Sequence, residues 1–432
     1  MALVDVAVLV ERGAFAELEV LYQRSLERHF SKTDFSERIH QDLFLFNASA
    51  EADRLSAAWV EKVPASAFAQ AARGGHLLAM AWEARGGRYA SDTPQENLYR
   101  MSQLGGRAKE HLGKAVRLDG RLLPAFAALV QLSKMNSEEA LGEAAFARGD
   151  AIDPACRYLS KEQMDALKPR WGGSVEAMQS YARQLALTVA ARPLMALSVV
   201  LPAADLGNIY FGAQQYADAV KVLEPAAHVA PMPELLGDLG LSMWRSNAQW
   251  WNTLARLLVA YRYDAGRFDV ARAAGTIMAD ENDPLWARTT LKRALALTTE
   301  DRYANFQLGR AYHMLHEYEI AEPFLTKALN GGDTHENALF LLAEGMMLAC
   351  QFEKAVAQSS QFVGSFPKSP RGWFQRAHLK SSQGVDKDAI AALATFLTVA
   401  DAGDPVWRSS IAFAKAQVKN GGKDGAEKPR KK

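Results

Sequence analysis

The chain has 432 residues, of which 49% are hydrophobic and 23% are charged, a composition that excludes wholesale disorder and allows a sizeable core. Its 50 basic and 49 acidic residues leave a net charge of +1, which argues against a dedicated nucleic-acid-binding protein, because such proteins usually carry a basic excess. The two cysteines, Cys156 and Cys350, are too few for a disulfide framework and suit a reducing compartment.

Targeting and membrane signals are not expected. The apolar start from Leu3 to Val10 is interrupted by Asp5, and no basic segment precedes it, so it does not resemble a secretory signal. The apolar region from Leu194 to Ala204 is about half as long as the roughly 20 residues that a bilayer span needs. We therefore expect a soluble cytoplasmic protein that makes no membrane contact.

Residues 1–195 are predicted to form an irregular helical domain. Apolar residues at helical spacing predict helices within 11–30 and 36–60. Ser174 is expected to cap a helix that continues to about Ala190. This half of the chain is thus predicted to be helical but less regular than the half that follows.

A weak repeat with a period of 34 residues is predicted inside this domain, beginning at 89 and again at 123. Ala108 and Leu112 take the second-helix positions of the first of these repeats. Glu138–Pro154 has the pattern of the second helix of the next repeat and ends at a proline.

Several segments of this domain carry a family resemblance. They are Trp59, Gly74, Ala81-Trp82-Glu83-Ala84-Arg85-Gly86 and Lys168-Pro169-Arg170-Trp171-Gly172-Gly173-Ser174. Together they resemble a bacterial family whose N-terminal region is a domain of unknown function, and whose members often carry tetratricopeptide-like repeats downstream. The resemblance covers roughly residues 1–195. It implies a helical fold and a bacterial source, and it brings no established activity.

The Trp171-Gly172-Gly173 segment has two interpretations. The favoured one is a tight turn plugged by the aromatic ring, and the other is a binding loop. Arg170 would supply an anion site to such a loop, whereas packing of its guanidinium on the ring is the favoured arrangement.

Six further repeats of 34 residues are predicted across 200–403, with starts at 200, 234, 268, 302, 336 and 370. Three positions each keep their residue type in five of the six. The eighth is Gly or Ala and the twentieth is Ala, except in the repeat at 234, and the twenty-fourth is Leu, except in the repeat at 336. A small eighth residue lets a second helix approach the first closely, and the leucine fills the space between neighbours. The pattern predicts an all-α fold, a helical-repeat solenoid of helix-turn-helix pairs preceded by the irregular helical half.

These repeats resemble the tetratricopeptide repeat. The repeat that starts at 200 has the family's residues at Leu206, Gly207, Tyr210, Ala219, Leu223, Ala226 and Pro231. The repeat that starts at 302 has them at Leu308, Gly309, Tyr312, Ala321, Leu325 and Ala328. The repeat that starts at 234 departs most, with Gly240, Leu241 and Thr253 in core positions.

Turn residues define the ends of the array. Asp283-Pro284 predicts a capped helix start with proline in its first turn. Asp404-Pro405 predicts the same start for a capping helix over 404–419. Residues 420–432 are predicted to be a disordered basic tail that keeps the end of the chain soluble, with a docking motif as the alternative.

The resemblance to the tetratricopeptide repeat implies that first helices line a concave groove and point positions 2, 5, 9 and 12 into it. The groove candidates are Tyr303, Phe306, Arg310, His313, Phe340, Glu344, Met347, Arg371, Phe374 and His378. Phe306, Phe340 and Phe374 share position 5 and would form an exposed aromatic ladder, of the kind that marks a binding surface. The alternative is that the array buries them internally.

A second aromatic cluster combines Trp244-Arg245 with Trp250-Trp251. Packing in the core of the irregular repeat is the favoured interpretation, and a peptide-gripping patch is the other. Trp244 and Arg245 are therefore secondary binding candidates, as are Arg170 and Trp171.

Signatures of catalysis are missing from the sequence. It has no phosphate-binding loop, no nucleophile elbow, no zinc-protease helix and no Cys-x-x-Cys pair. His313 and His316, three residues apart, could hold a metal on one helical face, but polar residues are ordinary at the end of a first helix. We expect no cofactor, no metal and no catalysis.

The favoured function is a cytoplasmic bacterial scaffold that binds a partner protein or peptide in the repeat groove, with an immunity protein, an inhibitor or a secretion-system adaptor as specific forms. An enzyme or small-ligand sensor around Arg170–Ser174 is the alternative, and it predicts a deep polar pocket there. Nucleic-acid contact through the basic tail would need a basic stripe on the body, which the composition does not suggest.

Overall fold

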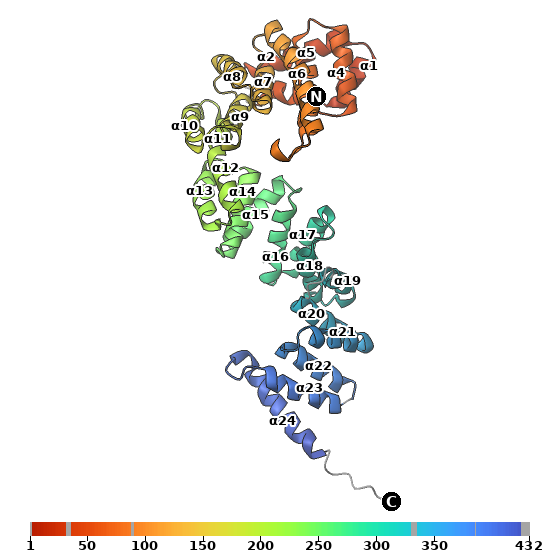
Figure 1. Ribbon diagram of the computed structural model, residues 1–432. Coiled ribbons are helices and arrows are strands. Elements are labelled where there is room, and N and C mark those ends of the chain that lie inside the picture. Colours follow the sequence, from red (N-terminus) through yellow and green to blue (C-terminus); the bar gives the residue numbers. More distant parts are fainter. Residues whose placement is uncertain (1, 32–35, 88–89, 330–334, 385, 425–432) are drawn as a thin grey trace, which may run out of the picture. The chain divides into compact units, whose positions relative to one another are not determined.

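The computed structural model describes residues 2–31, 36–87, 90–329, 335–384 and 386–424. All regular elements in these ranges are helices (Figure 1). The chain divides into two compact units, which are described separately. Unit 1 comprises Met1–Ala213 and Lys221–Pro231, and unit 2 comprises Gln214–Val220 and Met232–Lys432. The fold is all-α, with an irregular helical N-terminal half followed by a helical-repeat array.

Unit 1 begins with helices of unequal length. They are α1 (Leu3–Glu11), α2 (Phe15–His29), α3 (Arg38–Phe44), α4 (Ala50–Lys62), α5 (Ala67–Arg85), η1 (Ala90–Asp92), α6 (Gln95–Leu118), α7 (Leu123–Asn136), α8 (Glu139–Ile152) and α9 (Arg157–Ala166). The remaining elements of this part of the chain are η2 (Pro169–Trp171), α10 (Val175–Ala186), η3 (Pro193–Met195), α11 (Ala196–Val199), α12 (Leu201–Gly212) and α13 (Tyr216–Val229).

The core of unit 1 is built around Trp59, which is fully buried. Its ring lies 5.0 Å from that of Tyr22 and 6.0 Å from that of Phe46. Its indole N–H donates to a carboxylate oxygen of Glu19 at 2.7 Å. The buried tryptophan thus joins α2, α4 and the loop that leads into α4, and its one polar atom is satisfied.

Several sequence predictions for unit 1 are confirmed and others are wrong in detail. Ser174 caps α10 by accepting the amide of Ala177 at 3.1 Å, although α10 ends at Ala186 and not near 190. Residues 36–60 form two helices, because Ser49 caps α4 and ends the continuity with α3. The helix predicted over Glu138–Pro154 is α8.

The weak repeat predicted to begin at 89 is wrong in its first helix. Leu112 of α6 packs against Gly74 of α5, where an added Cβ would lie 2.6 Å from the leucine Cγ. The partner helix is therefore Ala67–Arg85, which precedes residue 89. A long connection between α5 and α6 displaces this pair from the 34-residue register.

One helical stretch in the described ranges, Pro193–Gly212, is long and apolar enough to cross a membrane by length and composition only. An 18-residue window of this 20-residue stretch has a mean hydropathy of 1.5, and 28% of that window is buried. In unit 1 it is divided into η3, α11 and α12, and Met195 lies in a core cluster with Tyr181 and Leu185.

Unit 2 consists of helical hairpins that follow one another along the chain (Figure 1). They are α14 (Pro233–Arg245) with α15 (Trp250–Tyr263), α16 (Phe268–Asp280) with α17 (Pro284–Leu297), α18 (Arg302–Met314) with α19 (Tyr318–Leu329), α20 (Glu336–Leu348) with α21 (Phe352–Ser365), and α22 (Pro370–Ser382) with α23 (Asp386–Val399). Each second helix also packs against the first helix of the next hairpin. This is the helix order of the tetratricopeptide repeat.

A glycine–leucine contact closes most hairpins. A Cβ on Gly275 would lie 2.6 Å from Cγ of Leu291, and one on Gly309 would lie 2.7 Å from Cγ of Leu325. In the irregular repeat, a Cβ on Gly240 would lie 2.7 Å from Cδ2 of Leu257. The glycine stands one residue before the expected position 8, so this repeat keeps the packing and shifts its register by one residue.

The helix caps expected at the turns are present. The Asp283 carboxylate accepts the amide of Trp286, and Pro284 is the first residue of α17. Asp404 likewise caps the short helix η4 (Pro405–Trp407), and α24 (Arg408–Asp424) follows. The prediction of a disordered tail from residue 420 is wrong up to Asp424, because α24 continues through Gly421 and Gly422 at a cost of about 1 kcal/mol each. The rest of that tail, 425–432, lies outside the described residues.

Substituting Gly309 by leucine tests the close approach of α18 and α19. We expect Gly309→Leu to lower the stability of the chain by about 1–3 kcal/mol, because the new side chain would overlap Leu325. The matched control is Gly364→Ala in α21, where nothing lies within 4 Å of an added Cβ, and a gain of about 0.5–1 kcal/mol is expected from helix propensity. Midpoints of thermal unfolding measure both, and an unchanged midpoint for Gly309→Leu would contradict the packing.

Candidate functional site

The first helices of three successive repeats in unit 2 enclose a hollow of about 500 Å³. We call it the first-helix hollow. Its lining residues are Tyr303, Phe306, Gln307 and Arg310 of α18, His335 before α20, Asn337 and Leu341 of α20, and Arg371 of α22. The repeat explains this set: residues 34 apart occupy equivalent places on neighbouring first helices, as Asn337 and Arg371 do.

Arg371 is the most distinctive group at the hollow. Its guanidinium carbon lies 3.4 Å from the centroid of the Phe340 ring, and one N–H donates to the Asn337 side chain at 3.0 Å. Within the described ranges, no carboxylate oxygen lies within 4.0 Å of its nitrogens. Burial lowers the pKa of Arg371, and the more distant Glu344 and Glu336 oppose this shift. Arg371 is thus a half-buried cation, and its guanidinium has more N–H donors than the bond to Asn337 uses.

Arg310, on the opposite wall, is already paired. It donates to a carboxylate oxygen of Asp280 at 2.5 Å and to Gln307 at 3.3 Å. Tyr303 is 39% exposed beside it. The hollow therefore has aromatic and aliphatic walls and two arginines: one pairs with a carboxylate, and the other pairs with no carboxylate among the described residues.

The exposed ladder of Phe306, Phe340 and Phe374 is wrong. Phe306 is only 6% exposed, and its ring lies 4.3 Å from that of His335. Phe340 is half-buried beneath Arg371. The capping helix α24 covers the third position, because Phe374 packs 5.1 Å from Phe396 and 6.3 Å from Phe413 of that helix.

The remaining groove candidates lie beyond the hollow. His378 is exposed and its ring stacks on that of Phe413 at 6.0 Å. Met347 is half-buried on α20. His313 Nε2 lies 3.3 Å from a carboxylate oxygen of Glu344, but the geometry is not that of a hydrogen bond. Burial raises the pKa of Glu344, with Arg371 opposing this shift.

Four further residues line the hollow and were not predicted from the sequence: Gln307, His335, Asn337 and Leu341. Asn337 occupies position 2 of its repeat and could have been found by the rule that selected Tyr303. Gln307 and Leu341 share position 6, which that rule does not include. His335 accepts the amide of Ala338 as a helix cap, so its place in the loop hides it from a helix-position rule.

In unit 1, the Trp171-Gly172-Gly173 segment forms a tight turn. Gly172 has φ +93°, and a Cβ on Gly173 would lie 2.1 Å from the Leu167 carbonyl oxygen. The Trp171 ring meets that of Trp82 edge-on at 5.9 Å, and the Arg85 guanidinium lies 5.3 Å from the Trp171 ring. The segments Ala81–Gly86 and Lys168–Ser174, both of which carried the family resemblance, therefore pack against each other through these side chains.

Arg170 is exposed, with its guanidinium carbon 6.0 Å from the Trp171 ring. Ser174 is engaged as the cap of α10. The contacts of this turn are those of the favoured structural interpretation.

Core packing of the second aromatic cluster is wrong for two of its three tryptophans, whereas Trp244 is half-buried. Trp250 and Trp251 are 42% and 52% exposed. The buried face of α15 contains Thr253, Leu257 and Ala260, and Trp251 stands two residues before it, about 200° around the helix. Arg245 lies 5.1 Å from the ring of Trp244.

Comparisons with known proteins give a fold likeness over part of the chain. No family model matches it, and no curated protein matches it. A structure of MamA (MSR-1) is 18% identical, with a TM-score of 0.36, and covers 39% of this chain and 95% of its own. MamA from Desulfovibrio magneticus RS-1 is 17% identical, with a TM-score of 0.36, and covers 39% and 94%.

A structure of YrrB, described as a TPR protein with an unusual peptide-binding site, is 15% identical with a TM-score of 0.37. It covers 41% of this chain and 91% of its own. At these scores the likenesses carry no argument about function. The resemblance of residues 1–195 to a bacterial domain of unknown function stays a prediction.

His313 is expected to make the stability of the chain depend on pH. Burial, together with smaller contributions from His316 and Arg371, lowers its pKa to about 4. Glu344 also faces the ring. The unfolded chain takes up a proton near pH 6.5, whereas the folded chain does so only near pH 4. Stability attributable to His313 is therefore lost as the pH falls from about 6.5 to about 4.

Denaturant unfolding of wild type and His313→Gln across this pH range measures the effect. The wild type should lose more stability on acidification than the variant. His378→Gln, at an exposed histidine of α22, is the control and should keep the wild-type dependence. Equal slopes for wild type and His313→Gln would show that the ring is not held neutral.

Proposed function

We propose that this chain is a protein–protein interaction scaffold, and that its first-helix hollow binds an extended segment of a partner protein that carries an acidic side chain. The observation that carries the proposal is Arg371, a half-buried guanidinium that faces an aromatic ring and has no carboxylate within 4.0 Å among the described residues. A carboxylate from a partner would accept hydrogen bonds from the remaining N–H groups of this guanidinium.

The other walls of the hollow support the same proposal. Tyr303 and Leu341 supply apolar surface, and the exposed Asn337 supplies a polar group that can bond to a peptide backbone. Arginine and aromatic residues in a partly desolvated hollow are the usual anchors of protein interfaces. The volume of about 500 Å³ suits a few side chains and not a folded domain.

We extend the proposal to the compartment and the cellular role of the chain. We place the binding in the cytoplasm of a bacterial cell and assign the chain a role as an immunity protein, an inhibitor or a secretion-system adaptor. Two free thiols, one of them the exposed Cys350, support a reducing compartment. The proposal gives the chain a binding role and assigns it no cofactor and no chemical step.

The alternative of an enzyme or small-ligand sensor around Arg170–Ser174 receives less support. The main chain closes tightly at Gly173, and Ser174 Oγ is engaged with the amide of Ala177. Among the residues that the structure describes, no buried polar side chain pairs with the exposed Arg170 to form the deep polar pocket which this alternative requires.

Selection from a library of random peptides on the full-length chain tests the proposal. Peptides with acidic residues should be enriched, and Arg371→Glu should weaken their binding at least tenfold, the effect of losing about 1.4 kcal/mol or more. Arg376→Glu is the matched control, because Arg376 is on the same helix α22 and bonds to Ser360 of α21.

Calorimetric titration of one selected peptide into the three proteins measures the affinities. The proposal is wrong if the selected peptides lack acidic residues, or if Arg371→Glu and Arg376→Glu bind them equally well.

A further inference from the structure

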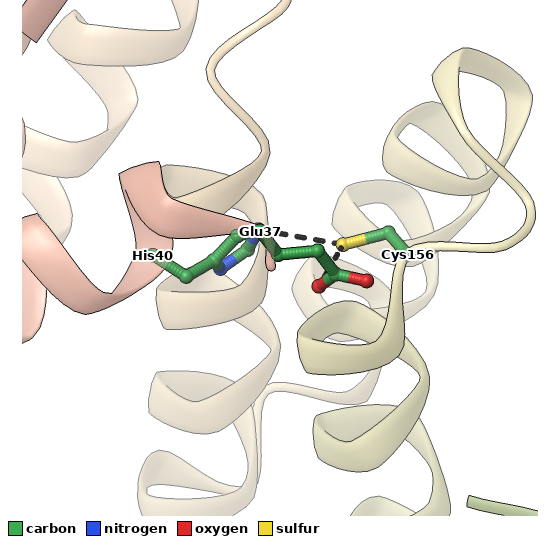
Figure 2. A group of neighbouring side chains, drawn as sticks. All are labelled: Glu37, His40 and Cys156. Carbon is green, nitrogen blue, oxygen red and sulfur yellow. Dashed lines mark hydrogen bonds between the residues drawn. The ribbon is translucent and has the colours of Figure 1, made fainter. Parts of the chain in front are cut away.

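Three side chains with metal-binding atoms meet in unit 1, far from the first-helix hollow in sequence. Glu37 and His40 lie at the start of α3, and Cys156 immediately precedes α9 (Figure 2). One ligand atom from each lies within 4.8 Å of the other two. All three residues are buried, with exposures of 3%, 1% and 0%. Sequence analysis had assigned them no role.

The surrounding chain holds each donor in place. Glu37 adopts the left-handed conformation at φ 49°, which is unfavourable for a residue with a side chain. Its carboxylate accepts the amides of Arg157 at 2.8 Å and Tyr158 at 3.2 Å, the first two residues of α9. The His40 ring stacks on that of Tyr158, with centroids 4.7 Å apart.

The separations fit tetrahedral coordination. Bonds of about 2.3 Å to sulfur and about 2.0 Å to nitrogen or oxygen place two ligand atoms about 3.5 Å apart. Sγ of Cys156 lies 3.4 Å from Nε2 of His40 and 3.6 Å from Oε2 of Glu37. A small displacement of the side chains would admit an ion between the three atoms.

We propose that Glu37, His40 and Cys156 bind one zinc ion. Sulfur, imidazole nitrogen and carboxylate oxygen are the three ligand types that zinc accepts in proteins. A thiolate and a carboxylate balance the charge of Zn²⁺ in a buried place where unbalanced charge is costly. The thiol proton leaves to solvent on binding.

The fourth coordination position goes to a water molecule. His40 and Tyr158 also line a cavity of about 370 Å³ in unit 1, bounded by side chains of α5 and α7 such as Trp82 and Gln131. This cavity is large enough to supply a water. The ion would join α3 to α9, two helices more than 100 residues apart in the chain.

A nucleophilic role for the Cys156–His40 pair is less consistent with the contacts. The sulfur is fully buried, and the Glu37 carboxylate beside it would oppose a thiolate that has no cation to balance it. Zinc binding uses the same carboxylate as a ligand.

Cobalt titration of the reduced, chelator-treated full-length chain tests the site, because Co²⁺ takes tetrahedral N/S sites and reports its ligands by absorption. We expect one Co²⁺ per chain, strong visible bands of four-coordinate cobalt and a thiolate-to-cobalt charge-transfer band, all lost on addition of Zn²⁺. Cys156→Ser should lose the charge-transfer band. Cys350→Ser, at the other cysteine of the chain, should keep it.

A second measurement does not depend on the folding of a variant. X-ray absorption of the zinc-loaded wild type should show one sulfur and three nitrogen or oxygen neighbours. The proposal is overturned if the wild type shows no charge-transfer band, if Cys350→Ser loses the band and Cys156→Ser keeps it, or if zinc has no sulfur neighbour.

Discussion

The close approach of two helices, permitted by a glycine that faces a leucine, is the constraint on which the repeat unit depends. Gly275 against Leu291 and Gly309 against Leu325 leave no room for a Cβ. Close helix contacts of this kind set the spacing of the hairpins, and with it the spacing of the first helices; in α20 and α22 the buried Ala343 and Ala377 take the place of the glycine. Residues 34 apart then come side by side, as the bond from Arg371 to Asn337 shows. The first-helix hollow is a consequence of this spacing, since three successive first helices line it.

The charged groups at the hollow favour a partner that carries an anionic group. Several arginines of the repeats pair with carboxylates of neighbouring hairpins: Arg310 pairs with Asp280, and Arg288 pairs with Glu317 of the following hairpin. Arg371 instead faces the ring of Phe340 and has only an amide oxygen as its partner within the described residues. An arginine that is half desolvated and only partly bonded favours an anion from outside. The other two arginines are paired within the array, whereas Arg371 is not paired with a carboxylate among the described residues. This difference is the reason for proposing that the partner segment is acidic.

The repeat architecture was predictable from the sequence because a 34-residue period leaves its mark at the eighth, twentieth and twenty-fourth positions. Even the one-residue shift at Gly240 preserves the contact that the pattern implies. Exposure was less predictable, since it depends on contacts that a period does not encode. Phe374 is covered because α24 folds back over it, and Trp251 is exposed because it lies off the packed face of α15. In the proposed zinc site, Glu37 and His40 stand only three residues apart, but the third donor, Cys156, lies more than 100 positions further along the chain, and no sequence pattern connects it to them.

The central claim, that the first-helix face binds the partner, is tested most directly by photo-crosslinking in cells that produce the chain. A photoreactive phenylalanine analogue would replace Tyr303, which is 39% exposed at the hollow, or Phe352, which is 37% exposed on the second helix α21. The account predicts a defined crosslinked partner from position 303 and none from position 352, with the crosslink lost when Arg371 is also changed to Glu. Crosslinks of equal yield from both positions, or a partner captured only from position 352, would contradict it.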